Sequence, residues 1–342
     1  MADQPMIKVE NLSIDYPVGR GGWFRSARKV VRAVNNVSFH IGHGETLGLV
    51  GESGSGKTTT GRAAIRRLPI AEGTVQFDGK DITNTSGEQL RQLRRNMQMI
   101  FQDPYGSLNP RKTILDTIAE PLIVHGIAKN TTKALPRVRE LLSLTGMPPD
   151  AINRFPHAFS GGQRQRIGIA RALAAEPDFL VVDEPVAALD TSIQAQVVNL
   201  LQDLQQRMNL TYLFIAHDLS VVRHISDRVA IMYAGELVEL ADRDEVYDSA
   251  IHPYTQSLLS AVPIPEPEVQ RNRQRIVIPG EVPDPSSPPP GCRFHTRCPF
   301  KQDERCDTEL VVLRELKPGH MVACHYAEEI ASGKIVMNPA VA

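Results

Sequence analysis

The stretch that most constrains this chain lies at residues 45–60, where an apolar run leads into a glycine-rich turn. Leu47 to Val50 are apolar, and Gly51 to Thr58 read GESGSGKT. This sequence fits the pattern G-x-x-x-x-G-K-[ST] of a phosphate-binding loop between a strand and a helix. Glycines let backbone N–H groups turn toward phosphate oxygens, and the following helix points its positive end at the same group. We therefore predict a site for a nucleoside triphosphate.

The residue types in this loop predict individual contacts. Lys57 supplies a charge for the β and γ phosphates, and the Thr58 hydroxyl is suited to bind Mg²⁺. A glycine-rich turn that binds nothing is disfavoured, because every fixed position of the pattern matches. The residues expected to contact the nucleotide are Gly51, Ser53, Gly54, Ser55, Gly56, Lys57, Thr58 and Thr59.

Length and composition are those of an ordinary globular protein. A chain of 342 residues predicts about two domains, and 42% hydrophobic with 23% charged residues is typical of globular chains. A net charge of −1 favours neither nucleic acid nor an anionic membrane as a partner. No apolar run approaches the roughly 18 residues that span a bilayer, and residues 1–10 do not resemble a secretion signal. We expect a cytoplasmic location, with membrane contact only through partner proteins.

Strand and helix patterns alternate along most of the chain. Strands are predicted at residues 6–18, 31–41, 47–50, 73–83, 97–101, 179–182, 213–216 and 228–240, and helices at 88–96, 114–144 and 192–208. This alternation around a phosphate-binding loop predicts an α/β fold, with a parallel sheet covered by helices on both faces.

Two features near the N-terminus keep more than one interpretation. Residues 19–30 are rich in glycine and arginine and are predicted as a loop between two strands, with Trp23 and Phe24 at its tip. Tyr16 fits either a half-buried strand aromatic or an aromatic that stacks on a nucleotide base.

An acidic pair follows a buried strand. Four apolar residues, Phe179 to Val182, end in Asp183 and Glu184, and ligands bind at the carboxyl ends of strands in such sheets. We predict that Asp183 holds Mg²⁺ and that Glu184 polarises the attacking water.

The sequence FSGGQRQR at residues 159–166 stands between the phosphate-binding loop and Asp183. It resembles the signature motif of ATP-binding cassette (ABC) ATPases. The resemblance implies a P-loop NTPase fold with a RecA-like core, an antiparallel β subdomain and an α-helical subdomain. It also implies an ATP site completed between two subunits, in which Ser160, Gly161, Gly162 and Gln163 contact the nucleotide bound by the opposite loop.

The other motifs of that family follow in the expected order. The resemblance makes Gln102 a ligand of Mg²⁺ and of the attacking water, Asp190 a residue that faces the partner subunit, and His217 a contact of the γ-phosphate. It favours base stacking for Tyr16. The implied catalytic residues are Glu184, His217, Gln102 and Lys57. The implied domains are an ATPase at residues 1–262, with a helical part at roughly 103–172, and an extension at 263–342.

A closer resemblance lies in QDPYGSLNPR at 102–111, HPYT at 252–255 and PGEVPDPSSPPPGCRFHTRCP at 279–299. These segments are similar to F-type ATPases of dipeptide and oligopeptide importers. The implied function is ATP hydrolysis at the cytoplasmic face of the membrane to energise peptide uptake. The implied partners are a D-type ATPase, two membrane permeases and a solute-binding protein.

Two alternatives to peptide import stay open at this point. Nickel and glutathione importers share this ATPase type. A soluble ABC protein outside transport is the remote alternative, and a single phosphate-binding loop without a heptad run disfavours it. A regulatory module that binds ATP without turnover is disfavoured by the presence of Lys57, Asp183, Glu184 and His217.

All four cysteines, Cys292, Cys298, Cys306 and Cys324, follow a proline-rich stretch at 263–290 that predicts a linker or loop-rich segment. In a reducing compartment such a cluster indicates a metal site rather than disulfides. The spacing lacks the C-x₂-C unit usual for structural zinc, and Pro299 follows Cys298 as proline follows cluster ligands in ferredoxins. The family resemblance implies a [4Fe–4S] cluster with a structural role; Zn²⁺ and metal-free thiols are the alternatives.

Overall fold

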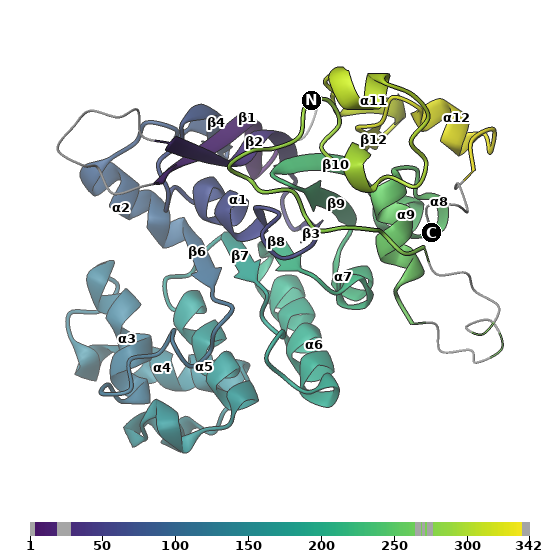
Figure 1. Ribbon diagram of the computed structural model, residues 1–342. Helices are drawn as coiled ribbons and strands as arrows, with labels where there is room; N and C mark the ends of the chain where they lie inside the picture. Colours follow the sequence, from purple (N-terminus) through teal and green to yellow (C-terminus); the bar gives the residue numbers. More distant parts are fainter. Residues whose placement is uncertain (1–3, 19–28, 264–267, 269–270, 272–275, 337–342) are drawn as a thin grey trace.

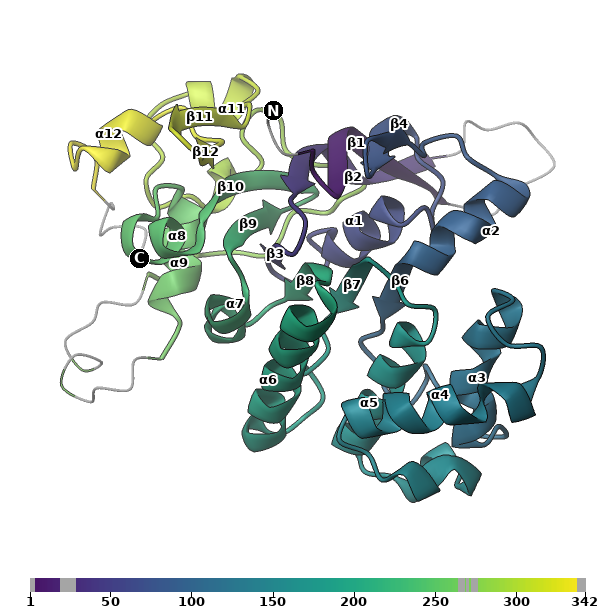
Figure 2. The same ribbon diagram turned by 180° about the vertical axis from the view of Figure 1, so that it is seen from behind.

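The fold is known from a computed structural model that describes residues 4–18, 29–263, 268, 271 and 276–336. Trp23 and Phe24, the predicted loop tip, lie outside the described residues. The described chain forms two sheets, a group of helices at one end and a small C-terminal unit at the other (Figures 1 and 2).

The first sheet is antiparallel and has the strand order β2-β1-β4-β5. Its strands are β1 (Ile7–Val18), β2 (Lys29–Ile41), β4 (Glu72–Phe77) and β5 (Lys80–Asp81). The predicted strands at 6–18, 31–41 and 73–83 are therefore confirmed, including the turn at Asp78 and Gly79 between β4 and β5.

The second sheet carries the nucleotide-binding motifs and has the order β11-β12-β10-β9-β3-β8-β7-β6. Strands β9, β3, β8, β7 and β6 pair in parallel, and β10, β12 and β11 extend the sheet antiparallel. Every residue of β3, β7 and β8 is buried, because parallel strands are covered on both faces. The strands are β3 (Thr46–Val50), β6 (Met97–Ile100), β7 (Phe179–Asp183), β8 (Thr211–Ala216), β9 (Arg228–Tyr233), β10 (Glu236–Asp242), β11 (Arg314–Lys317) and β12 (His320–Val322).

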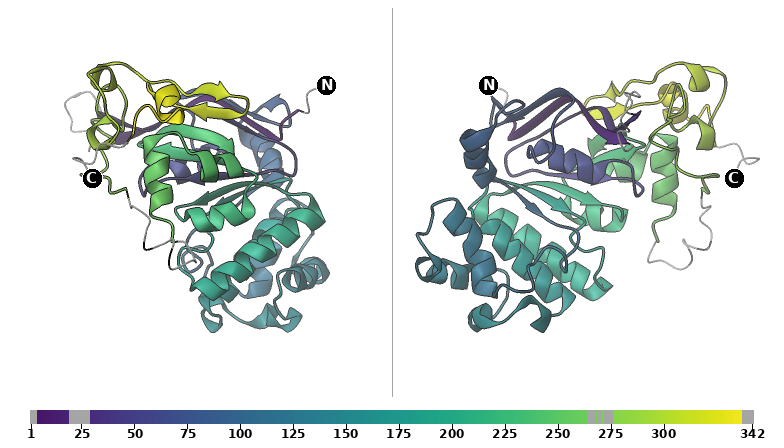
Figure 3. Two further views of the ribbon diagram at one scale, coloured as in Figure 1. Left: turned by 90° about the vertical axis from the view of Figure 1, so that its right-hand side faces the viewer. Right: turned by 60° about the vertical axis from the view of Figure 1, so that its left-hand side comes forward.

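Helices cover both faces of this sheet. Helix α1 (Lys57–Ala64) lies between the two sheets, and α6 (Thr191–Met208) covers the opposite face (Figures 1 and 3). Among the described residues, no helix is both long enough and apolar enough to cross a bilayer. The other helices around the sheet are α2 (Gly87–Asn96), α7 (Leu219–Ile225), α8 (Arg243–Ser249) and α9 (Pro253–Ser260).

The helical group contains α3 (Ile114–Val124), α4 (Thr131–Leu144) and α5 (Gly161–Leu173), with short 3₁₀ turns at Pro149–Asn153 and Pro156–Ala158. The prediction of one helical stretch over 114–144 is wrong between α3 and α4. Gly126 there has φ +73°, and Asn130 caps α4 by accepting from the Lys133 N–H at 3.0 Å. A left-handed residue followed by a new N-cap ends one helix and begins the next.

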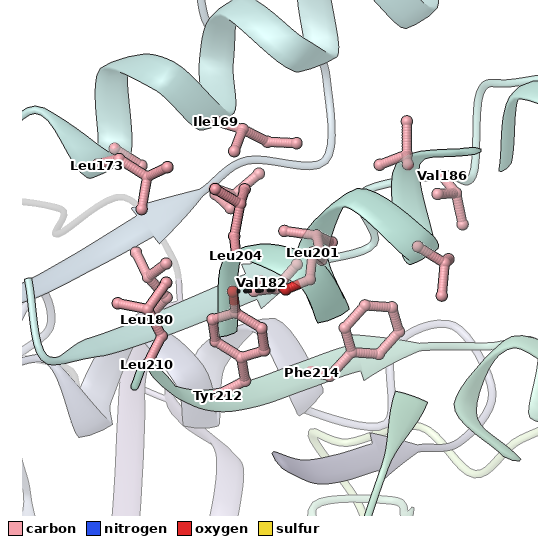
Figure 4. Packing of buried hydrophobic residues seen from close by; sticks show 14 of the residues in the cluster. Ile169, Leu173, Leu180, Val182, Val186, Leu201, Leu204, Leu210, Tyr212 and Phe214 are labelled. Carbon is pink, nitrogen blue, oxygen red and sulfur yellow. Dashed lines mark hydrogen bonds between the residues drawn. The ribbon is translucent and has the colours of Figure 1, made fainter. Parts of the chain in front are cut away.

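The main core lies between the sheet and the helices on its α6 face (Figure 4). Leucine, isoleucine and valine side chains from α5, α6 and β7 pack there against Tyr212 and Phe214 of β8. Tyr212 is buried at the centre, and its hydroxyl donates to the carbonyl of Leu201 at 3.0 Å. Burial removes the tyrosine from water, and this hydrogen bond satisfies its polar atom.

The C-terminal unit lies at the opposite end from α3, α4 and α5 (Figures 1 and 2). It contains a 3₁₀ turn at His295–Arg297, α11 (Arg305–Thr308), the hairpin β11–β12 and α12 (Ala327–Ala331). The described part of the proline-rich stretch, residues 276–290, contains no strand, as predicted. The hairpin β11–β12 was not predicted; it extends the main sheet by pairing β12 with β10.

A buried carboxylate fastens this unit to the sheet. Glu239 of β10 is 0% exposed, and it accepts from the backbone N–H groups of Ile251 and His252 at 2.8 and 3.1 Å. The third partner is the His320 ring of β12, at 2.7 Å. A buried charge is tolerated when its hydrogen bonds are complete, so Glu239 joins β10, the start of α9 and the C-terminal unit.

Replacing Glu239→Ala should lower the free energy of unfolding by about 3 kcal/mol, because it leaves buried donors without an acceptor. Chemical denaturation of the full chain measures the loss. The control is Glu315→Ala on β11, where an exposed carboxylate accepts from the Gly319 N–H, and a change within about 0.5 kcal/mol is expected. Equal losses in the two variants would contradict the role of Glu239.

Candidate functional site

The predicted site residues follow strands whose carboxyl ends lie at one edge of the parallel sheet. Strand β3 ends at Val50, immediately before the loop Gly51–Gly56 and helix α1. Strand β7 ends in Asp183, and His217 follows the last residue of β8. Because β3, β8 and β7 are parallel neighbours, their carboxyl ends bring these residues together.

Steric limits explain two glycines of the loop. A Cβ at Gly51 would lie 2.1 Å from the carbonyl oxygen of Met232, and one at Gly56 would lie 2.6 Å from that of Ala33. Gly56 also has φ +103°, a conformation that side chains with a Cβ rarely adopt. Close packing from behind therefore requires glycine at both positions.

Lys57 is held inside the loop that it follows. Its Nζ donates to the carbonyl oxygens of Gly51 and Glu52 at 2.7 and 2.9 Å. Burial lowers the pKa of Lys57, while the nearby carboxylates of Glu184, Asp183 and Glu52 oppose that shift. The ammonium group is thus aimed into the loop, where phosphate oxygens could replace the two carbonyls.

Asp183 and Thr58 form the predicted Mg²⁺ pair. The Thr58 hydroxyl donates to Asp183 Oδ1 at 2.8 Å, and Asp183 is 1% exposed. Burial raises the pKa of Asp183, and the Thr58 hydrogen bond lowers it in part. Hydroxyl and carboxylate oxygens are ligands that suit Mg²⁺, so the donor set fits this cation.

Glu184 is the meeting point of the other polar side chains. Gln102 donates from Nε2 to Glu184 Oε2 at 2.7 Å, and His217 Nδ1 lies 3.4 Å from the same oxygen. Glu184 has φ +43°, uncommon for a residue with a side chain, and its N–H donates to Ile215 O at 2.9 Å. Such backbone strain is concentrated at functional sites.

These groups surround one cleft of about 540 Å³. Gly51, Ser55 and Asp183 are not among the residues that line it, and Asp183 instead lines the neighbouring groove. Ala33 of β2 lines the cleft without having been predicted. The residues that line the cleft are Ala33, Ser53, Gly54, Gly56, Lys57, Thr58, Thr59, Gln102, Glu184 and His217.

The motif Ser160-Gly161-Gly162-Gln163 lies apart from this cleft, at the start of α5. Ser160 Oγ accepts from the Gln163 N–H at 3.4 Å, and Gln163 Oε1 accepts from the Ser160 N–H at 3.0 Å. This reciprocal pair is a capping box. The motif therefore forms the capped N-terminus of α5 and does not line the chain's own cleft.

Two further predicted contacts also lie outside the cleft lining. Asp190 caps α6 by accepting from the Ile193 N–H at 3.0 Å. Tyr16 is 37% exposed on β1.

Two residues that support the loop were missed by the sequence analysis. Tyr254 of α9 accepts from the Glu52 N–H at 2.9 Å, and Arg297 pairs with the Glu52 carboxylate at 2.9 Å. Both are more than 200 residues away along the chain. The motifs at 252–255 and 279–299 contain them, but nothing in those motifs points to a contact with Glu52.

The four cysteines line one small closed cavity of about 20 Å³, and all four are free thiols. Burial raises the pKa of Cys292 to about 11 and that of Cys324 to about 12. Within the described residues, no group of three or more His, Cys, Asp or Glu side chains is arranged to hold a single metal ion. The residue type itself, four thiols that line one cavity, is the one that ligates iron–sulfur clusters and structural zinc in other proteins.

The two glycines Gly51 and Gly54 give a matched test of the loop. Gly51→Ala should lower the free energy of unfolding by about 3 kcal/mol because its Cβ overpacks the loop against Met232. Gly54 has φ +79° with open space around its Cα, so Gly54→Ala should cost only about 1 kcal/mol. Denaturant titration of both variants measures the difference, and a harmless Gly51→Ala would refute the packing argument.

Comparison with known proteins agrees with this geometry. Residues 34–187 match the family profile described as ABC transporter, and residues 238–306 match the one described as oligopeptide/dipeptide transporter, C-terminal region. A solved dimeric ATP-binding cassette in a post-hydrolysis state, bound to ADP and Pi, has a TM-score of 0.62 and 29% identity. It covers 70% of this chain and 99% of its own.

Two relatives from Bacillus subtilis (strain 168) align along nearly the whole chain. The oligopeptide transport ATP-binding protein AppF is 50% identical over 94% of this chain and 97% of its own length. The oligopeptide transport ATP-binding protein OppF is 53% identical over 89% and 94%. The chain therefore belongs to the ABC transporter family, as an ABC ATPase of the kind represented by the oligopeptide transport ATP-binding proteins.

Proposed function

We propose that this chain is the ATP-hydrolysing subunit of an importer of dipeptides or oligopeptides. The observation that carries the proposal is the end-to-end similarity to relatives named for oligopeptide transport, together with the match of residues 238–306 to a transporter-specific region. An intact set of polar groups in the cleft, Lys57, Asp183, Glu184 and His217, supports ATP turnover rather than regulatory binding alone.

The phosphates of ATP would lie against the N–H groups of the loop and the start of α1. Lys57 would exchange its carbonyl partners for phosphate oxygens. Thr58 and Asp183 would hold Mg²⁺, with Gln102 beside them. The ion would supply charge neutralisation for the transferred phosphoryl group, and Thr58 and Asp183 already lie within hydrogen-bond distance of each other.

Glu184 is the proposed general base. Its Oε2 accepts from Gln102 and lies near the His217 ring, so both neighbours can fix the carboxylate toward an attacking water. His217 and Gln102 are then positioned to stabilise the charge that develops on the γ-phosphate.

A second ATPase subunit would complete the site. Because Ser160, Gly161 and Gly162 lie apart from the chain's own cleft, they would serve the nucleotide of the partner, and the partner's equivalent motif would serve this one. We propose a homologous D-type ATPase as that partner, with Asp190 and Gln163 facing it.

The permeases would contact a separate groove of about 1100 Å³ next to Gln102. Arg67 and Arg171 lie over the Phe101 ring there, 5.1 and 5.7 Å from its centroid. Arginines around an aromatic ring favour a partner segment with acidic and apolar side chains. Gln102 lines both the groove and the ATP cleft, which would connect permease movement with hydrolysis.

This assembly would locate the chain at the cytoplasmic face of the membrane, with a solute-binding protein outside.

We divide the chain into an ATPase domain at 1–262, with its helical part at roughly 103–172, and an extension at 263–342. We propose that Tyr16 faces the adenine, on the strength of the family resemblance.

Glu184→Gln separates binding from hydrolysis. In the complex with its permeases, this variant should bind ATP as the wild type does but lose at least about 100-fold in hydrolysis, because the general base is gone. Peptide uptake into vesicles should stop with it. The control is Glu315→Gln, a change of an exposed carboxylate on β11. Full turnover in Glu184→Gln would show that another group is the base.

The same vesicles decide the substrate class. Uptake of a labelled dipeptide or oligopeptide supports the proposal, while uptake of only nickel or glutathione supports the alternatives. Failure of the chain to co-purify with any permease would contradict a role in transport.

We also propose that the four cysteines hold a [4Fe–4S] cluster that stabilises the fold of the extension, with Zn²⁺ as the alternative. Four thiols that line one closed cavity support it.

Anaerobic purification gives the test. Iron and acid-labile sulfide in equal amounts, with a broad visible absorption that disappears in Cys298→Ser, are expected for the cluster. Zinc without sulfide would favour the alternative, and neither element in freshly prepared protein would contradict both. The matched control is Glu315→Gln, since Glu315 is an exposed residue of β11 in the same unit and is not among the residues that line the cavity of the thiols.

A further inference from the structure

The segment between the first two cysteines, residues 292–298, packs behind the phosphate-binding loop. It contains two arginines, Arg293 and Arg297, that point away from the cysteine cavity toward the ATPase core. Their contacts end on the loop itself and on the turn that supports it, although the segment is 245 residues from Glu52 along the chain.

Arg297 makes a two-pronged contact with Glu52. Nη1 lies 2.9 Å from Oε2, and Nη2 lies 3.4 Å from Oε1. The guanidinium also donates to the Tyr233 hydroxyl at 3.3 Å and to the Pro279 carbonyl at 3.2 Å. The Arg297 side chain is 8% exposed. A planar fork with this many partners fixes its acceptor in one orientation.

Glu52 is therefore held from three sides. Its carboxylate meets Arg297, its N–H donates to the Tyr254 hydroxyl at 2.9 Å, and its carbonyl accepts from Lys57 at 2.9 Å. The pattern of the phosphate-binding loop leaves this position free. The charged side chain at this position points to the side of the loop opposite the nucleotide. It can therefore fix the backbone conformation of the loop without contacting the nucleotide.

Arg293 supports the other half of the loop. Its Nε lies 2.8 Å from Glu236 Oε1, and its Nη1 donates to the carbonyl of Ala234. The next residue, Gly235, donates its N–H to the Ser55 carbonyl at 2.9 Å. The two arginines thus reach the loop at residues 52 and 55 by separate routes.

Aromatic packing fixes the segment between the two arginines. Phe294 is 1% exposed, and its ring centroid lies 5.1 Å from that of Tyr233 and 5.4 Å from that of Tyr254. Both tyrosines also take part in the contacts to Glu52 and Arg297. Because buried aromatic rings are closely packed, a shift of the segment would be transmitted to the arginines.

We propose that residues 292–298 are a positioning element of the ATP site, in which Arg297 acts through Glu52 to set the loop that receives the phosphates. Net stabilisation alone explains the pair poorly, because buried ion pairs are often no more stable than apolar replacements. The contribution of this contact is to fix the orientation of Glu52 and, through it, the geometry of the loop. The C-terminal extension therefore controls nucleotide affinity from behind the loop, in addition to whatever the four thiols hold.

A double-mutant cycle on the full chain tests this. Arg297→Gln and Glu52→Gln should each raise the Kd for a fluorescent Mg·ATP analogue roughly tenfold, and the double variant should raise it no further, because both remove the same contact. Arg297→Lys, which keeps the charge but loses the fork, should lie between wild type and Arg297→Gln.

The control is Arg314→Ala in the same extension. Arg314 pairs with Glu328 at 2.6 Å, and both side chains are largely exposed, so the Kd should be unchanged. All affinities are measured at a temperature where circular dichroism shows every variant folded. Effects of Arg297→Gln and Glu52→Gln that add, or a lowered Tm with an unchanged Kd, would overturn the proposal.

Reciprocity supplies a second readout. If the segment sets the loop, nucleotide binding must in turn stabilise the segment by the same free energy. Mg·ATP should slow amide hydrogen exchange at 292–298 in the wild type but not in Arg297→Gln. Unchanged exchange in the wild type would count against the coupling. Failure of the wild type to bind ATP would instead contradict the proposed ATPase function, so the two outcomes are distinguishable.

Discussion

The structure depends on one constraint at the phosphate-binding loop: the N–H groups that are to bind phosphate must stay free, so the loop has to be held from behind through its other groups, including the Glu52 N–H. The usual backbone pairing of a strand or helix would consume those donors. Here the rear contacts come from other parts of the chain. Gly51 packs on the Met232 carbonyl, Ser55 accepts from Gly235, and Glu52 is held by Tyr254 and Arg297. The second sheet, α9 and the extension thus meet at one loop.

The same logic explains why the signature motif is separate from the cleft. Ser160 accepts from Gln163 in the capping box, which leaves the hydroxyl hydrogen of Ser160 free to donate. A helix N-terminus with a free hydroxyl is suited to an anion, yet the chain's own cleft does not include it. A phosphate that uses both elements therefore has to lie between two subunits, as we propose.

Local patterns predicted what local forces decide. Fully apolar runs gave β3, β7 and β8, and the motifs that follow them gave Asp183, Glu184 and His217. The prediction of a continuous helical stretch across α3 and α4 was wrong because the apolar periodicity continues across Gly126, where the backbone is left-handed. A helix boundary of this kind depends on one or two residues rather than on the periodic pattern.

Long-range contacts lay beyond sequence reasoning for a different reason. Glu239 and His320 are 81 residues apart and pair only because β12 lies beside β10. Polar residues of this kind are more often exposed, so composition predicts the opposite of what is seen. Glu184 is a second example of a feature that the sequence does not predict. Its left-handed backbone, with φ +43°, goes with the N–H bond to Ile215 and the turn after β7, and glutamate has no preference for this conformation.

The balance of side-chain charges in the cleft explains why a cation is needed there for nucleotide binding. The cations Lys57 and Arg62 act on the two carboxylates Asp183 and Glu184, so the side chains alone offer no excess of positive charge where a polyanion is to bind. Burial already raises the pKa of Asp183, which shows that its ionised form is poorly solvated. A divalent cation between Thr58 and Asp183 would favour that ionised form and also reverse the repulsion of the γ-phosphate. Nucleotide and cation binding should therefore be coupled through Asp183, while the loop geometry set from behind by Glu52 determines how well Lys57 meets the same phosphate.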